Sequence, residues 1–236
     1  MTTIPGKSRE LHDDEAHLLA ALAAIDAADG RLDAAQQTLV IEALSHPAKP
    51  ARREAAVLVA RLLQAKRIEA SPVAAQLEGQ PAARWGAAFA LARAGLCDDR
   101  VVDAAVAALG DSDGDVRWAA SSIVSPRARV SEGLARRLAG LSRTGAPAVR
   151  KMALLCLCDS GCTDAALFRH GLDDDDRYVR LAALACLGRI ADRSQETIAG
   201  VERIASSDPY PNVRRAACAI LERRLTNPAP SSTGKE

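Results

Sequence analysis

The chain has 236 residues, of which 48% are hydrophobic and only 3% aromatic, and its formal net charge is +1. This near-neutral charge excludes a global attraction to nucleic acid, membrane surfaces or acidic substrates, so any electrostatic role must come from a local patch. Abundant Ala, Leu and Arg, with few aromatic residues, favour closely packed helices over a sheet. We therefore expect one all-α body.

The sequence predicts neither a membrane-spanning helix nor a secretory signal. The longest apolar run, about residues 152–158, is far shorter than the roughly 20 residues that a membrane-spanning helix needs. The first residues, MTTIPGKSRELHDDE, lack the apolar core of a secretory signal, which predicts a cytoplasmic protein. We expect disorder in residues 1–9, a flexible tail in residues 226–236, and a single repeat domain in residues 10–225.

A repeated pattern organises the chain: a polar turn, an arginine, and then an Ala-rich amphipathic run. The arginines recur 30 to 34 residues apart, and the second and third positions after each one are mostly small. A fixed period in the thirties is the signature of a solenoid of stacked helical pairs. The aligned arginines are Arg53, Arg84, Arg117, Arg150, Arg180 and Arg214.

Turn residues and apolar periodicity predict the helices in chain order. Residues 10–28 form a helix that caps the exposed end of the stack, and Gly30 ends it. In the third pair the second helix ends before Pro126, because proline cannot extend a helix without losing a hydrogen bond. The predicted pairs are 31–45 with 51–65, 71–78 with 81–94, 98–109 with 115–124, 131–141 with 147–159, 163–172 with 177–191, and 194–205 with 212–225.

The pattern D-x-x-V-R-x-x-A-A-x-x-L-G, clearest in residues 111–124, 173–188 and 208–221, resembles HEAT repeats. Its short period is similar to the compact subset named after phycobilisome lyases. The resemblance covers roughly residues 31–225 and implies an α-α superhelix, a HEAT-like α-solenoid of about six helix pairs with an N-terminal capping helix. It also implies that turn aspartates and arginines brace neighbouring repeats. The implied pairs are Asp113 or Asp115 with Arg117, Asp174 with Arg180, and Asp208 with Arg214.

Function is expected on the face that packing does not use. At about 100° per residue, positions three, six, seven and ten after the arginine share the core side, and positions one, five and eight lie opposite. In HEAT-like stacks the second helices line the concave surface. Both tryptophans fall at position one of adjacent repeats, and aromatic side chains are favoured binding anchors, although a strongly curved stack would bury them instead. The predicted partner-binding residues are Trp85, Phe89, Trp118, Lys151, Leu155, Leu181 and Arg215.

A basic segment follows Ser125. Residues 125–151 contain seven basic side chains against one acidic side chain, that of Glu132. Such a run is usually a solvated face, and the alternative is a grip on an acidic partner or a phosphate. A nucleic-acid partner is not expected, because a basic stripe along many repeats is missing. The predicted basic patch comprises Arg127, Arg129, Arg136, Arg137 and Arg143.

No catalytic, metal or cofactor site is expected. Cys156 should face the core and Cys158 should face outward, so the spacing of the cysteines does not favour a soft-metal site. The four histidines lie outside the predicted concave columns. Deoxyhypusine hydroxylases share this type of repeat but carry His-Glu pairs for iron, and this sequence contains no such pair.

The sequence therefore predicts a non-enzymatic scaffold, monomeric or weakly oligomeric, that holds a protein or peptide partner on its concave face. Two alternatives remain. HEAT-like alkylpurine DNA glycosylases place Trp, Asp and Arg in a basic cleft, and Trp85, Trp118, Asp115 and Arg150 offer these residue types. Bilin lyases of the compact subset are the second alternative, although nothing in the sequence specifies a tetrapyrrole site.

Overall fold

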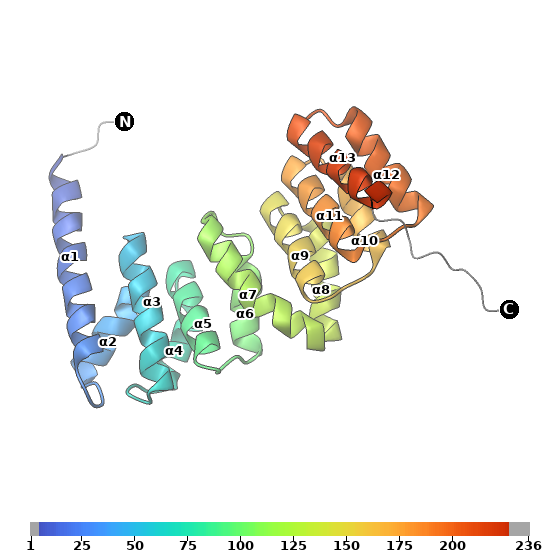
Figure 1. Cartoon of the computed structure of the whole chain (residues 1–236). Helices are drawn as coiled ribbons and strands as arrows, with labels where there is room; N and C mark the ends of the chain where they lie inside the picture. The colour runs from blue at the N-terminus through green and yellow to red at the C-terminus, as the bar shows by residue number, and fades with distance from the viewer. Residues whose placement is uncertain (1–4, 227–236) are drawn as a thin grey trace. The chain divides into compact units, whose positions relative to one another are not determined.

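The computed structural model describes residues 5–226, with side chains for residues 14–223 (Figure 1). Every element in this range is an α-helix or a short 3-10 helix, which confirms the all-α prediction. The elements are α1 (Pro5–Ala27), α2 (Ala34–Glu42), η1 (Ala43–Ser45), α3 (Lys49–Gln64), α4 (Ala70–Ala75), η2 (Gln76–Glu78), α5 (Pro81–Arg93), α6 (Asp99–Ala108), α7 (Gly114–Val130), α8 (Glu132–Thr144), α9 (Pro147–Asp159), α10 (Ala165–His170), η3 (Gly171–Asp173), α11 (Arg177–Ile190), α12 (Gln195–Ser207) and α13 (Pro211–Thr226).

These helices form two compact units. Unit 1 contains the chain up to Ala108 together with Asp113–Ile123, and unit 2 contains Leu109–Ser112 and the chain from Val124 onward. Helix α7 therefore contributes its first part to unit 1 and its second part to unit 2. The six predicted helical pairs are all present, and the repeat runs through both units. A single repeat domain over residues 10–225 stays a prediction.

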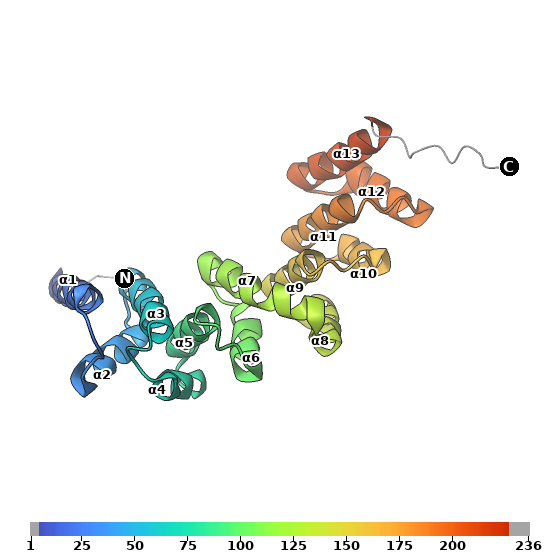
Figure 2. The same ribbon diagram turned by 60° about the horizontal axis from the view of Figure 1, so that its bottom comes forward.

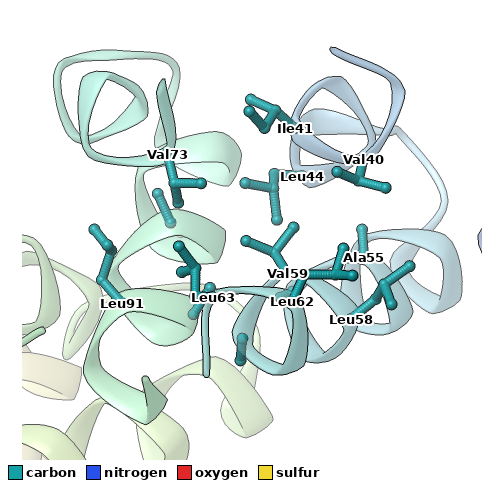
Figure 3. Close-up of a cluster of buried hydrophobic side chains, with 14 of the residues drawn as sticks. Val40, Ile41, Leu44, Ala55, Leu58, Val59, Leu62, Leu63, Val73 and Leu91 are labelled. Atoms are coloured by element: carbon teal, nitrogen blue, oxygen red, sulfur yellow. The ribbon is translucent and has the colours of Figure 1, made fainter. Parts of the chain in front are cut away.

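In unit 1, the second helices of successive pairs pack side by side. Helix α1 packs on α3, and α3 packs on α5, while α2 and α4 lie on the other side of this row (Figure 2). The core between the two rows contains Leu44, Leu62, Val73 and Leu91, all almost inaccessible to water (Figure 3). A Cβ atom at Gly86 would lie 3.1 Å from a methyl carbon of Leu44, so glycine lets α5 approach η1 closely.

The capping helix α1 begins at Pro5 and not at Glu10, so the predicted disorder is wrong for residues 5–9. Proline suits the first position of a helix, because its φ angle is already helical and its missing N–H would have no partner there. The rest of the terminal predictions, for residues 1–4 and for the tail beyond residue 226, lies outside the described residues. Leu22 and Ile25 of α1 are buried in the unit 1 core, as a cap requires.

Helix α7 continues through Pro126 to Val130, so the prediction that it ends before the proline is wrong. Proline has a helix-compatible φ angle, and inside a helix it removes a single hydrogen bond at a cost of about 3 kcal/mol. The helix continues beyond the proline because Arg127, Ala128 and Arg129 are good helix formers. Ser131 then starts α8, where its hydroxyl accepts a hydrogen bond from the Leu134 N–H at 3.3 Å.

Unit 2 stacks three helical pairs, α8 with α9, α10 with α11, and α12 with α13 (Figure 1). Its second helices α9, α11 and α13 pack in succession. Because α9 lies between α8 and α11, its sequence MALLCLC over residues 152–158 is almost entirely buried. This run is the longest apolar run of the chain, and it is apolar because α9 packs against α8 on one side and against α11 on the other.

The arginine ladder of unit 2 connects successive repeats. The Arg180 guanidinium donates to both carboxylate oxygens of Asp208, at 2.6 and 3.2 Å, and Arg150 donates to both oxygens of Asp174, each at 2.7 Å. Within its own repeat, Arg180 donates only to backbone carbonyls, including that of Asp174 at 2.7 Å, and Arg214 likewise donates to the Asp208 carbonyl at 2.6 Å. The predicted carboxylate pairs Asp174 with Arg180 and Asp208 with Arg214 are therefore wrong, because each of these carboxylates binds the arginine of the preceding repeat. The pairing of Asp113 or Asp115 with Arg117 stays a prediction.

In unit 1 the first repeat arginine is Arg52 and not Arg53. Arg52 donates to the backbone carbonyls of His46 and Pro47 at 2.7 and 2.6 Å, the contact that the other repeat arginines make with their own turns. Arg53 is exposed and makes no such contact. Arg84 donates to its own turn at 3.1 Å, but its buried Nε atom has no hydrogen-bond partner in the described part of the chain.

Candidate functional site

Unit 1 contains a cavity of about 280 Å³ on the face formed by α3, α5 and the start of α7. We call it the unit 1 cavity. Its walls are largely apolar, and its polar groups are basic side chains and two aspartates. The lining residues are Leu44, Lys49, Arg52, Arg53, Ala56, Val57, Ala82, Trp85, Gly86, Phe89, Arg93, Asp113, Asp115, Val116 and Ala119.

Helix α5 supplies the aromatic wall of this cavity. Trp85, Phe89 and Arg93 follow one another at intervals of four residues, which places them on one side of the helix. The ring centroids of Trp85 and Phe89 are 5.7 Å apart with a tilt of 56°, and the Arg93 guanidinium carbon lies 5.6 Å from the Phe89 centroid. Both rings are only half-buried, so part of each aromatic surface remains open to a ligand.

A charged bridge spans α3 and α7 at the cavity. The Lys49 ammonium lies 2.8 Å from Asp113 Oδ2 and 2.9 Å from Asp115 Oδ2. The hydrogen bond from Lys49 is the main reason that the pKa of Asp113 is lowered, and the two aspartates raise the pKa of Lys49. The bridge holds one cation against both aspartates at the cavity wall and offsets one of their two negative charges.

Trp118 does not line the unit 1 cavity with Trp85. Its side chain is 54% exposed, while its neighbours Val116 and Ala119 form the cavity wall. Residues three apart share one side of a helix, whereas Trp118 is turned about 200° from Val116 and about 100° from Ala119. Equal repeat positions in α5 and α7 therefore do not line the same cavity.

The other predicted partner-binding residues lie in unit 2. Lys151 and Leu155 are half-buried on α9, Leu181 is half-buried on α11, and Arg215 is exposed on α13. These four side chains thus sit on the second helices, as predicted, and keep some access to solvent. Whether they contact a partner stays a prediction.

The predicted basic patch mixes internal contacts with exposed charge. Arg129 donates to the carbonyls of Asp159 and Ser160 at 3.1 and 3.3 Å, which caps the end of α9. Arg136 pairs with Glu132 one turn away at 3.1 Å. Arg137 and Arg143 are exposed on α8, and Arg127 is half-buried on α7. The patch is therefore partly structural.

The sequence did not indicate an aromatic cluster at the starts of α11 and α13. The Arg177 guanidinium carbon lies 4.7 Å from the Tyr178 ring centroid and 5.0 Å from that of Tyr210. Its Nη2 atom also donates to the Tyr178 hydroxyl at 2.7 Å. Both rings are well exposed. Equal repeat positions would not reveal this cluster, because Tyr178 precedes its repeat arginine by two residues and Tyr210 precedes its own by four.

A polar hollow of about 380 Å³ in unit 2 was also missed. It lies over α10, η3 and α12, and its rim carries Arg169, His170 and Arg203 with Asp173 and Glu196. Arg203 pairs with Asp173, and Arg169 donates to the hydroxyls of Ser194 and Thr197. The sequence-based prediction placed function on the second helices, which line the concave surface. The residues of this hollow lie mainly on first helices, so they were not predicted.

The cysteines are free thiols, and most occupy the predicted positions. Cys156 and Cys186 are fully buried, and burial raises the pKa of Cys156 to about 11. Cys158 is also buried, contrary to the outward orientation predicted for it, because α9 is covered on two sides. A hydrogen bond with Cys186 lowers the pKa of Cys158. Over the residues with described side chains, no group of three or more His, Cys, Asp or Glu side chains could hold a metal ion.

Stacked helical pairs with inter-repeat arginine bridges define an α-helical repeat protein. A family model for HEAT repeats matches residues 134–222, which identifies these residues as HEAT repeats and confirms the resemblance over that segment. No curated protein matches the chain. Within the described residues, no helix is long and apolar enough to cross a membrane.

Solved structures that match the chain include one designed repeat protein and two engineered proteins. A designed armadillo repeat protein is 17% identical, with 78% of this chain and 97% of that chain covered at a TM-score of 0.43. Two engineered proteins are each 18% identical. The match with the first covers 79% of this chain and 95% of the engineered chain, at a TM-score of 0.43. The match with the second covers 80% of this chain and 98% of the engineered chain, at a TM-score of 0.44.

Proposed function

We propose that this protein is a non-enzymatic repeat scaffold that holds a peptide segment of a protein partner in the unit 1 cavity. The observation that supports the proposal is the half-buried pair of Trp85 and Phe89 on the cavity wall. Large aromatic side chains with open apolar surface are the usual anchors of protein recognition. An apolar side chain of the partner packs against these rings.

The size of the unit 1 cavity favours a side chain over a cofactor. Its volume is about 280 Å³, at the lower limit of the roughly 300 to 1,000 Å³ found for small-molecule sites. A tetrapyrrole needs a larger site, so the bilin-lyase alternative gains no support from this cavity. One or two peptide side chains fill a space of this size.

The DNA-glycosylase alternative requires Trp, Asp and Arg side chains that are free to act. Arg150 is held by Asp174 and Asp175, Asp115 is held by Lys49, and Trp118 does not line the cavity. None of the three is therefore available in the arrangement that this alternative needs.

We keep the second-helix residues Lys151, Leu155, Leu181 and Arg215 as secondary contacts for a longer partner. The cytoplasmic location and the monomeric or weakly oligomeric state remain predictions.

A random peptide display library, panned against the full chain, tests the proposal. We expect wild type to enrich peptides that share a bulky apolar residue, and Trp85→Ala with Phe89→Ala to abolish this enrichment. Trp118→Ala is the matched control, because it removes an exposed tryptophan of unit 1 outside the cavity. Failure of wild type to enrich any peptide class, or equal enrichment by the cavity double variant in its folded form, refutes the proposal.

A further inference from the structure

The charges around the unit 1 cavity indicate which class of peptide fits it, an inference that rests on the proposed function. Four basic and two acidic side chains line the cavity. Lys49 is occupied by Asp113 and Asp115, and Arg52 is occupied by the two backbone carbonyls of its turn. After these internal pairs are formed, the remaining charge at the cavity is positive.

The two remaining cations are Arg53 and Arg93. Arg53 is exposed on α3 and, within the described part of the chain, has no carboxylate or hydrogen-bond acceptor. Arg93 is exposed at the end of α5, where its guanidinium lies over the Phe89 ring and pairs with no carboxylate of the described residues. A guanidinium stacked on a ring keeps its N–H groups free at its edge, so it can still bind a carboxylate through two hydrogen bonds.

Helix geometry sets the spacing between the aromatic wall and Arg93. At about 1.5 Å per residue, Arg93 lies about 6 Å beyond Phe89 and about 12 Å beyond Trp85 along α5. An extended peptide advances about 3.3 Å per residue. A side chain seated against these rings is therefore two to four residues away from the peptide position that meets Arg93.

We propose that the unit 1 cavity selects acidic peptides. A bulky apolar side chain packs on Trp85 and Phe89, and an Asp or Glu two to four residues away pairs with Arg93. A second carboxylate on the other side of the apolar residue meets Arg53, which lies near the start of α3. The Lys49 bridge supports this selection, because its positive charge offsets one of the two negative charges of the aspartates that would otherwise repel the peptide.

The test compares the peptides enriched by wild type with those enriched by the double variant Arg53→Gln and Arg93→Gln. We expect wild type to enrich Asp or Glu two to four residues from the apolar residue, and the double variant to keep the apolar preference without the acidic one. Arg143→Gln is the matched control, since Arg143 is an exposed arginine of unit 2. For one enriched peptide, replacing its Glu by Gln should weaken binding to wild type roughly three- to ten-fold, and less in high salt.

The outcomes separate this inference from the proposed function. Apolar enrichment by wild type without an acidic preference refutes the selection of acidic peptides while the peptide-binding proposal stands. An acidic preference that persists in the folded double variant also refutes the roles of Arg53 and Arg93. If wild type enriches no peptides at all, both proposals fail. Both arginines are exposed, so we expect the double variant to fold, and its circular dichroism melt checks this.

Discussion

The two units of this protein brace their repeats in different ways. In unit 2, Arg150 and Arg180 each bind both carboxylate oxygens of an aspartate in the next repeat, and Asp208 is 1% exposed in its pair. In unit 1, the buried Nε atom of Arg84 has no partner among the described residues, and the bridge between α3 and α7 comes from the half-exposed Lys49. Buried, doubly hydrogen-bonded pairs hold geometry far more strictly than exposed lysine pairs do.

This difference coincides with the location of the proposed binding site. The HEAT family model matches only residues 134–222, which lie in unit 2, where the ladder is formed. The cavity with half-buried aromatic rings lies in unit 1, where the ladder is incomplete. The unit with the incomplete ladder is thus the unit that contains the proposed binding cavity. The predictions below test this contrast.

The largest effect is expected when the buried ladder of unit 2 is broken. Arg180→Ala leaves the Asp208 carboxylate buried without its cation, and breaking a buried pair on one side costs about 3 to 5 kcal/mol. Both tryptophans lie in unit 1 and both tyrosines in unit 2. Denaturant unfolding followed by tryptophan and by tyrosine signals therefore reports the two units separately, and the loss should appear in the tyrosine signal.

Arg84→Ala is the matched control for Arg180→Ala. The variant removes one hydrogen bond to a backbone carbonyl and no carboxylate pair, so we expect a loss of about 1 kcal/mol in the tryptophan signal. If Arg84→Ala destabilises unit 1 as strongly as Arg180→Ala destabilises unit 2, the ladder is equally important in both units and the contrast is wrong.

Acid should weaken unit 2 through the same aspartates. Burial raises the pKa of Asp208, but hydrogen bonds from Arg180 and from the Tyr210 N–H outweigh it, so the folded-state pKa is lowered; the pKa of Asp174 is lowered in the same way. A lowered folded-state pKa gives stability that is complete above the unfolded value of about 3.9 and is lost as pH falls through the folded value.

Melts followed by the tyrosine signal between about pH 6 and pH 3 measure this loss. The slope should be smaller in Asp208→Asn, which carries no titrating group at this position. An unchanged slope in this variant would show that Asp208 does not contribute to the acid sensitivity. Asp113 of unit 1 also has a lowered pKa, but its exposed pair with Lys49 should make the tryptophan signal less sensitive to acid.

The sequence contained enough information to predict the helical pairs, because a period of 30 to 34 residues, small residues and turn prolines mark each helix. It did not identify the partners of the arginines. Asp174 and Asp208 precede the arginines of their own repeats by six residues, but their carboxylates face the previous repeat, and this choice depends on the stacking of the helices. Adjacent arginines at 52 and 53 left the register of the first repeat ambiguous, and only contacts with the turn resolve it.

The cavity residues were predicted only in part, for a similar reason. Trp85 and Phe89 share one helix, so helix periodicity alone placed them together. Trp118 belongs to another helix, and repeat alignment does not encode whether equal positions of two helices line the same cavity. Arg53 was aligned with the structural repeat arginines, and Arg93 gave no signal of its own, because an unpaired arginine can be recognised only when its neighbours are known.

The smallest effect is expected at the charged bridge of unit 1. Lys49→Gln removes an exposed cation from Asp113 and Asp115, and exposed pairs contribute about 0 to 1 kcal/mol. The tryptophan unfolding transition should shift slightly at low salt, and the shift should disappear near 1 M salt, where the Debye length is about 3 Å. A loss above about 2 kcal/mol that persists in high salt would mean that the bridge holds the fold and would contradict the contrast between the units. With stability almost unchanged, the variant should bind acidic peptides more weakly than wild type does, because the cavity loses one positive charge beside its two aspartates.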